Sequence, residues 1–136
     1  MDIEYTLEVQ PDDVPVRGNA AASGDDVEDR AVEDEILRRL DAGDVWAWCL
    51  VTVRARLEVD GERFTGYASL GACNYDGEQD WRASNWVDMK AEALDDLLSK
   101  LDDAVNRGEF ARSLRVQIRA GADISHVDAK FAIPIS

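Results

Sequence analysis

The chain has 136 residues and a formal net charge of −14, with 29 acidic against 15 basic side chains. Apolar residues make up 46% of it and include four tryptophans, a composition that supports one domain with a core and excludes a wholly disordered chain. The acidity disfavours direct contact with nucleic acids or anionic membranes, because such contacts need Lys and Arg.

Three further features bear on the compartment. The longest apolar stretch, 45–53, is shorter than the roughly 20 residues of a membrane span. The N-terminus lacks the basic and apolar regions of a signal peptide, and two cysteines without a CxxC pair do not form a disulfide scaffold. We therefore expect a cytoplasmic protein.

The N-terminal third predicts a strand, a loop and a helix. Residues 3–9 alternate apolar and polar side chains, as a half-buried strand does, and 10–24 carry the Pro and Gly residues of a loop. Ser23 and Asp26 have the spacing of a capping box that opens a helix, and Gly43 ends that helix. Its expected apolar stripe is Val27, Ala31, Val32, Ile36, Leu37 and Leu40.

A β-hairpin follows, because Asp60-Gly61 is a type I′ turn signal between two alternating runs. With Val59 opposite Glu62, one face pairs only apolar residues: Leu57 with Phe64, Val53 with Ala68, and Val51 with Leu70. The other face pairs Arg56 with Thr65, Arg54 with Tyr67, and Thr52 with Ser69. A slip of one residue would destroy this agreement, so the register is well specified. The same register places Cys49 on the core face of the hairpin and Cys73 on the opposite face, which argues against a disulfide between them.

The C-terminal half predicts a polar loop at 73–85, a second helix capped by Ser84-Asn85, and one or two strands. The helix runs to about Asn106 and stops at Gly108, with inward residues Val87, Ala91, Leu94, Leu98, Leu101 and Val105. Leu114–Ile118 alternates as a strand, and Ala129–Ile135 suits a last edge strand. The segment 120–136 is the least regular part of the pattern.

This order, β-α-β-β-α-β, predicts a single α+β domain over 1–136. It is the order of the ferredoxin-like split βαβ, in which two helices cover one face of an antiparallel sheet.

The acidic residues recur on the outward faces of both predicted helices. If the helices lie in parallel, they present one carboxylate surface to a protein that normally binds a polyanion. The alternative is that the charge only keeps the protein soluble. The candidate partner-binding residues are Asp25, Asp26, Asp29, Glu33 and Asp34 on the first helix and Asp88, Glu92, Asp95, Asp96, Asp102 and Asp103 on the second.

A group of aromatic residues falls on the sheet face away from the predicted core. Two interpretations stay open: this face is exposed and binds a partner or a second copy, or a loop at 10–24 or 73–85 covers it. The residues are Trp46, Trp48, Tyr67, Tyr75 and Trp81.

Catalytic and metal signals are weak. His126 is the only histidine, and with Cys73 alone it makes no specific nucleophile–base pattern, so we predict a surface residue. The helix acids fit no calcium-loop spacing. We expect no cofactor, no metal and no enzymatic activity, with a carboxylate-dependent hydrolase or metal-binding protein as an alternative.

Several segments resemble those of small uncharacterised acidic proteins of bacteriophages and mobile elements. The likeness covers roughly 9–105, and its clearest segments are Pro15-Val16-Arg17-Gly18-Asn19, Ser23-Gly24-Asp25-Asp26, Gly43-Asp44-Val45-Trp46-Ala47-Trp48-Cys49 and Gly71-Ala72-Cys73-Asn74-Tyr75. That group has no established activity, so the resemblance implies a setting and no site residues.

Together these observations favour a non-enzymatic binding protein that inhibits a nucleic-acid-binding defence complex, of the anti-CRISPR or anti-restriction type, by mimicking a polyanion. The alternative is an assembly module that binds a protein, or a second copy of itself, through the aromatic face.

Overall fold

Four strands and three α-helices make up the part of the chain that the computed structural model describes, residues 2–109 and 123–129. In chain order they are β1 (Glu4–Pro11), α1 (Asp26–Asp41), β2 (Cys49–Val59), β3 (Glu62–Cys73), α2 (Glu78–Trp81), α3 (Val87–Asn106) and β4 (Ile124–Ala129). Contacts divide the chain into two units: unit 1 is Met1–Leu7, Thr52–Ser69 and Asn85–Val127, and unit 2 is Glu8–Val51, Leu70–Ser84 and Asp128–Ser136.

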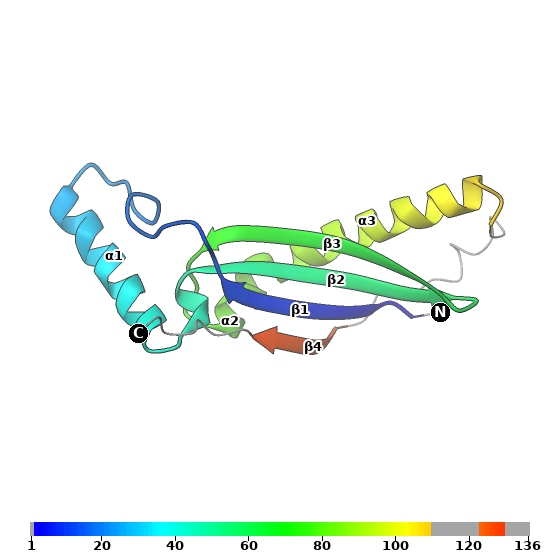
Figure 1. The fold of residues 1–136 in the computed structure, drawn as a ribbon, viewed down its shortest axis with the longest axis horizontal. Helices are drawn as coiled ribbons and strands as arrows, with labels where there is room; N and C mark the ends of the chain where they lie inside the picture. Colours follow the sequence, from blue (N-terminus) through cyan, green and yellow to red (C-terminus); the bar gives the residue numbers. More distant parts are fainter. Residues whose placement is uncertain (1, 110–122, 130–136) are drawn as a thin grey trace. The chain divides into compact units, whose positions relative to one another are not determined.

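The strands form one sheet in the order β3-β2-β1-β4. The α+β class is confirmed, but the ferredoxin-like order and the all-antiparallel sheet are wrong. The arrows in Figure 1 show β4 running in the direction of β1, and β2 running opposite to β1, which makes the sheet mixed. Since β2 returns directly beside β1, the connection through α1 is not the parallel crossover that a split βαβ requires.

The hairpin has the predicted turn and register. Asp60 and Gly61 both have positive φ, 51° and 82°, as a type I′ turn requires. The hydroxyls of Thr52 and Ser69 lie 3.2 Å apart, and alternate residues of β2 are buried from Cys49 to Val59. The prediction fails at the far end of β3, where Leu70 is 40% exposed.

In unit 1, α3 packs on the strands through a stripe that shares Leu101 with the predicted one and otherwise differs from it. The buried residues are Met89, Ala93, Leu97, Leu101 and Ala104, and Val87, expected inside, is 76% exposed. The reason lies in Gly66 of β3. A Cβ atom there would lie 2.2 Å from the carbonyl oxygen of Ala93 and 2.3 Å from the amide nitrogen of Leu97, so the α3 backbone sits directly on the strand.

The helical segment before α3 begins earlier than expected. The predicted loop at 73–85 is helical from Glu78, and a π-helical turn, Arg82–Trp86, joins α2 to α3. Ser84 and Asn85 therefore lie within this turn and do not cap a helix.

In unit 2, α1 packs against the segment before it and the short 3₁₀ turn Val45–Ala47. Its N-cap is Asp25, whose carboxylate accepts hydrogen bonds from the amides of Val27 and Glu28, and not Ser23 as predicted. The buried cluster consists of Val16, Ile36, Ala47 and Trp48, flanked by Ala20, Leu37 and Leu40. Val27 and Val32 of the predicted stripe are 82% and 42% exposed.

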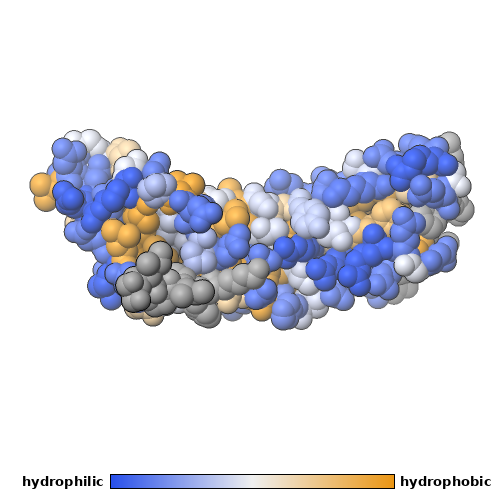
Figure 2. Space-filling model, in the orientation of Figure 1, coloured by the Kyte–Doolittle hydropathy of each residue, from blue (hydrophilic) through white to orange (hydrophobic). Residues whose placement is uncertain are grey.

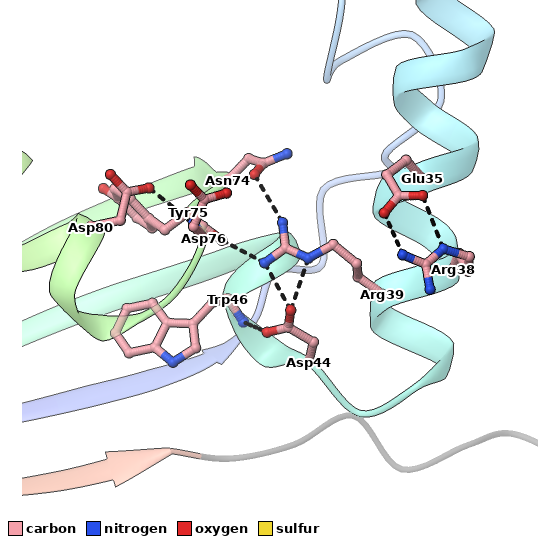
Figure 3. Close-up of polar contacts among 9 residues, drawn as sticks. All are labelled: Glu35, Arg38, Arg39, Asp44, Trp46, Asn74, Tyr75, Asp76 and Asp80. Atoms are coloured by element: carbon pink, nitrogen blue, oxygen red, sulfur yellow. Dashed lines mark hydrogen bonds and ion pairs between the residues drawn. The ribbon is translucent and has the colours of Figure 1, made fainter.

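Arg39 connects α1 to two other segments of unit 2 (Figure 3). Its guanidinium donates to the carboxylate of Asp44 at 2.8 Å, to the carbonyl of Tyr75 at 2.6 Å and to the side-chain oxygen of Asn74 at 3.3 Å. Asp44 also accepts from the amide of Trp46 at 3.1 Å. One half-buried side chain thus joins α1, the 3₁₀ turn and the segment after β3.

The predicted strand Leu114–Ile118 lies outside the described residues, as does most of Ala129–Ile135. The described strand near the C-terminus, β4, pairs with β1, and the Ser125 hydroxyl donates to the Tyr5 carbonyl at 3.0 Å.

Candidate functional site

Carboxylates on the outward face of α3 form one row along the helix. Asp88, Glu92 and Asp95 follow one another at four- and three-residue intervals, and Asp102 comes two turns later, which is the repeat of one helix face. From Asp88 to Asp102 the row extends about 21 Å at the usual rise per residue. Figure 2 shows hydrophilic residues over the C-terminal half of α3.

This row lies opposite the residues that fix α3 to the sheet. At about 100° per residue, Glu92 and Asp95 point away from Ala93 and Leu97, which are 0% exposed. Asp103 is exposed beside the row and Asp102 is half-buried. The carboxylates therefore stand on a rigid support, and little conformational entropy is lost when a partner contacts them.

Asp96 is the remaining candidate on α3. It is half-buried, and its side chain contacts β3. Its carboxylate accepts from the Tyr67 amide at 2.9 Å and pairs with Lys100 at 3.0 Å. The hydrogen bond from Tyr67, followed by the one from Lys100, lowers the pKa of Asp96. Asp96 is thus a structural carboxylate at the margin of the row.

The α1 carboxylates are mostly engaged in local contacts of unit 2. Asp25 is the N-cap, and Asp29 accepts from the Ser23 hydroxyl at 2.6 Å, a contact that lowers the pKa of Asp29. Glu33 is 8% exposed and accepts from the Gly18 amide at 2.7 Å and from Arg17 at 3.3 Å. Because Glu33 is buried, the prediction that it belongs to an exposed partner-binding surface is wrong.

Two other α1 acids complete this group. Asp34 pairs with Arg17, and Asp26 lines an open hollow of about 630 Å³ whose other walls are Gly18, Ala21, Ala22, Gly24, Asp29, Arg30 and Glu33. The two helices belong to different units, so a single surface made from both stays a prediction.

Most of the aromatic group is buried. Trp48, Tyr75 and Trp81 are 3%, 6% and 0% exposed, so an open face containing these three is wrong. The Trp48 indole donates to the carbonyl of Val14 at 2.7 Å, so the segment 10–24 covers it, as the alternative interpretation predicted. Trp46 lies 6.2 Å from the Tyr75 ring and 6.5 Å from the Trp81 ring.

Tyr67 differs from these residues. It belongs to unit 1 and is 47% exposed, and the Lys100 ammonium lies 4.9 Å from its ring centre. Arg54 lies 5.9 Å from the same ring. Tyr67 and the half-buried Trp46 are the aromatic candidates with surface left for a partner.

The two cysteines are free thiols in different environments. Cys49 is 0% exposed, and burial raises its pKa to about 12. Cys73 is half-buried and donates to the Gly71 carbonyl at 3.2 Å. His126 is exposed, as predicted, on β4.

We expect one of the two thiols to react with a thiol reagent in the native protein. Only the thiolate reacts appreciably, and Cys49 is both protonated at neutral pH and inaccessible. Titration with dithionitrobenzoate should release about one equivalent under native conditions and two in denaturant. The Cys73→Ser variant should release none until it unfolds, and a fast equivalent from that variant would contradict the burial of Cys49.

Comparisons with protein-family models, with curated proteins and with solved structures found no match. Within residues 2–109 and 123–129, no set of three His, Cys, Asp or Glu side chains is arranged to hold a metal ion. In the same ranges, no helix has the length and apolarity needed to cross a membrane.

Proposed function

We propose that this protein is a non-enzymatic inhibitor that binds a nucleic-acid-binding protein through an acidic surface. The observation that carries this proposal is the row of exposed carboxylates along α3, on the face opposite its packed residues. A protein that contacts phosphates with Lys and Arg would meet Asp88, Glu92 and Asp95 at four- and three-residue intervals along a helix that is packed on the sheet.

The spacing of the row supports this assignment. Successive carboxylates in the first part of the row are separated by about 4.5–6 Å along the helix axis, while a single nucleic-acid strand presents a phosphate about every 3.4 Å of axis. The row is thus a sparser linear anion array, and the net charge of −14 adds long-range attraction for a basic partner.

The setting that we propose is the cytoplasm of a bacterium infected by a phage or carrying a mobile element. There the partner would be a defence complex that binds nucleic acid, of the anti-CRISPR or anti-restriction target type. The resemblance of 9–105 to small acidic phage proteins supports this setting, and the charge pattern supports the class of partner.

The test is a pulldown from host lysate with the tagged full chain, followed by elution with duplex DNA and, separately, with salt. We expect the retained protein to be a nucleic-acid-binding one and to be released by both eluents, because counterions screen the contact and DNA competes for the same basic site. The Asp88→Asn, Glu92→Gln, Asp95→Asn and Asp103→Asn combination should reduce capture at least tenfold.

The matched control removes the same number of exposed charges elsewhere, in Glu4→Gln, Asp13→Asn, Asp60→Asn and Glu62→Gln. This variant should keep most of the binding, since only its long-range attraction falls. If both variants lose binding equally, the effect is one of net charge and the α3 surface is not the site. Retention that neither DNA nor salt reverses would also refute the mimicry.

A further inference from the structure

Within residues 2–109 and 123–129, strand β3 is an edge of the sheet, because the order of the described strands is β3-β2-β1-β4. In the observed register, residues 63, 65, 67 and 69 direct their backbone N–H and C=O groups away from β2. Such an edge is a template on which another strand can pair, and folded proteins usually obstruct it.

Two α3 side chains occupy this edge. The Asp96 carboxylate accepts from the Tyr67 N–H at 2.9 Å, and the Lys100 ammonium donates to the Thr65 C=O at 2.8 Å. Asp96 and Lys100 also pair with each other at 3.0 Å. An acceptor thus stands where the carbonyl of an added strand would bind, and a donor stands where its amide would bind.

The position of α3 makes this contact possible. Gly66 lies between Thr65 and Tyr67 in sequence, and its missing side chain lets the α3 backbone reach the strand. The Lys100 ammonium also lies 4.9 Å from the Tyr67 ring centre, which adds a cation–π attraction. These contacts join the middle of β3 to α3.

We propose that Asp96 and Lys100 form an inhibitory contact that closes the β3 edge to strand addition, and that the partner fitting the freed edge is the β3 edge of a second copy. Two identical edges can pair antiparallel about a two-fold axis, each offering the other the same donors and acceptors. The freed strand is a direct continuation of the existing sheet, and the charge of −14 on each copy makes salt favour the pairing.

The test is the mass of the Asp96→Ala/Lys100→Ala variant, measured by light scattering over a range of concentrations and salt. We expect a mass rising from that of the unmodified chain toward twice that value, more strongly at high salt. The Glu35→Ala/Arg38→Ala variant, which removes an exposed ion pair of α1 with the same zero change in net charge, should behave like the unmodified chain. Adding Ser69→Pro, which removes an outward N–H, should reverse the association.

A folded Asp96→Ala/Lys100→Ala variant that keeps the mass of the unmodified chain would overturn the proposal. If that variant does not fold, amide hydrogen exchange of the unmodified chain decides between the alternatives. The proposal requires the Tyr67 amide to exchange at least tenfold more slowly than the outward Ser69 amide. Equal exchange of the two would show that Asp96 does not hold the edge.

Discussion

Replacing Gly66 with alanine is expected to lower the free energy of unfolding by about 3 kcal/mol, a large effect for one methyl group. The new Cβ would lie 2.2 Å from the Ala93 carbonyl oxygen and 2.3 Å from the Leu97 amide nitrogen. Both are backbone atoms, so no rotamer change relieves the overlap, and α3 must move away from β3.

The measurement is urea unfolding of the full chain, with Gly77→Ala as the control. Gly77 has nothing within 4 Å of an added Cβ and an extended φ of 168°, so its variant should change stability by less than about 1 kcal/mol. A Gly66→Ala protein as stable as the control would mean that α3 does not approach β3 as closely as described.

Replacing Arg39 with alanine is expected to lower the free energy of unfolding by about 1.5–3 kcal/mol, the range for hydrogen bonds to charged groups. Arg39 is 16% exposed at its side chain and holds Asp44, Asn74 and the Tyr75 carbonyl together. Its loss leaves the Asp44 carboxylate without its cation at the start of the 3₁₀ turn. Lysine should recover little of this, because an ammonium cannot reproduce the fork of contacts.

The adjacent residue supplies the control for this prediction. Arg38 pairs with Glu35 at the surface, with side chains 68% and 56% exposed, and Figure 3 shows both arginines on α1. The Arg38→Ala change should stay within about 0.5 kcal/mol, as for other exposed ion pairs. Equal losses at 38 and 39, measured by urea unfolding with tryptophan fluorescence, would exclude the connecting role of Arg39.

The elements with strictly local causes could be predicted from the sequence. The Asp60-Gly61 turn and the alternation on both sides of it determine the hairpin register. The strand pairing could not be predicted. The alternating pattern of 3–9 indicates a strand, but it does not indicate whether β2 pairs with that strand in a parallel or an antiparallel direction. Strand pairing depends on contacts between segments that are far apart in the chain, and the packing of α1 on Val16 and Trp48 is also a contact of this kind.

The candidate site shows the same division. The acidic row of α3 could be identified from spacing alone, but burial of Glu33 could not, because it depends on the Gly18 amide fifteen residues away. The predicted α3 stripe is right at Leu101 but wrong at Leu94 and Leu98, because the close approach at Gly66 places Ala93 and Leu97 against the strand. Gly66 within a strand was an available signal, because such glycines often mark a close backbone approach.

The division of the chain into units has a consequence for synthesis. Each unit is assembled from separated segments, since the chain passes from one to the other at 7–8, 51–52, 69–70, 84–85 and 127–128. Unit 1 needs the first residues of the chain together with α3, so a ribosome must release most of the protein before that unit can close. Until α3 is available, the hairpin formed by β2 and β3 lacks the helix that packs on it. The nascent chain is then exposed to aggregation and proteolysis.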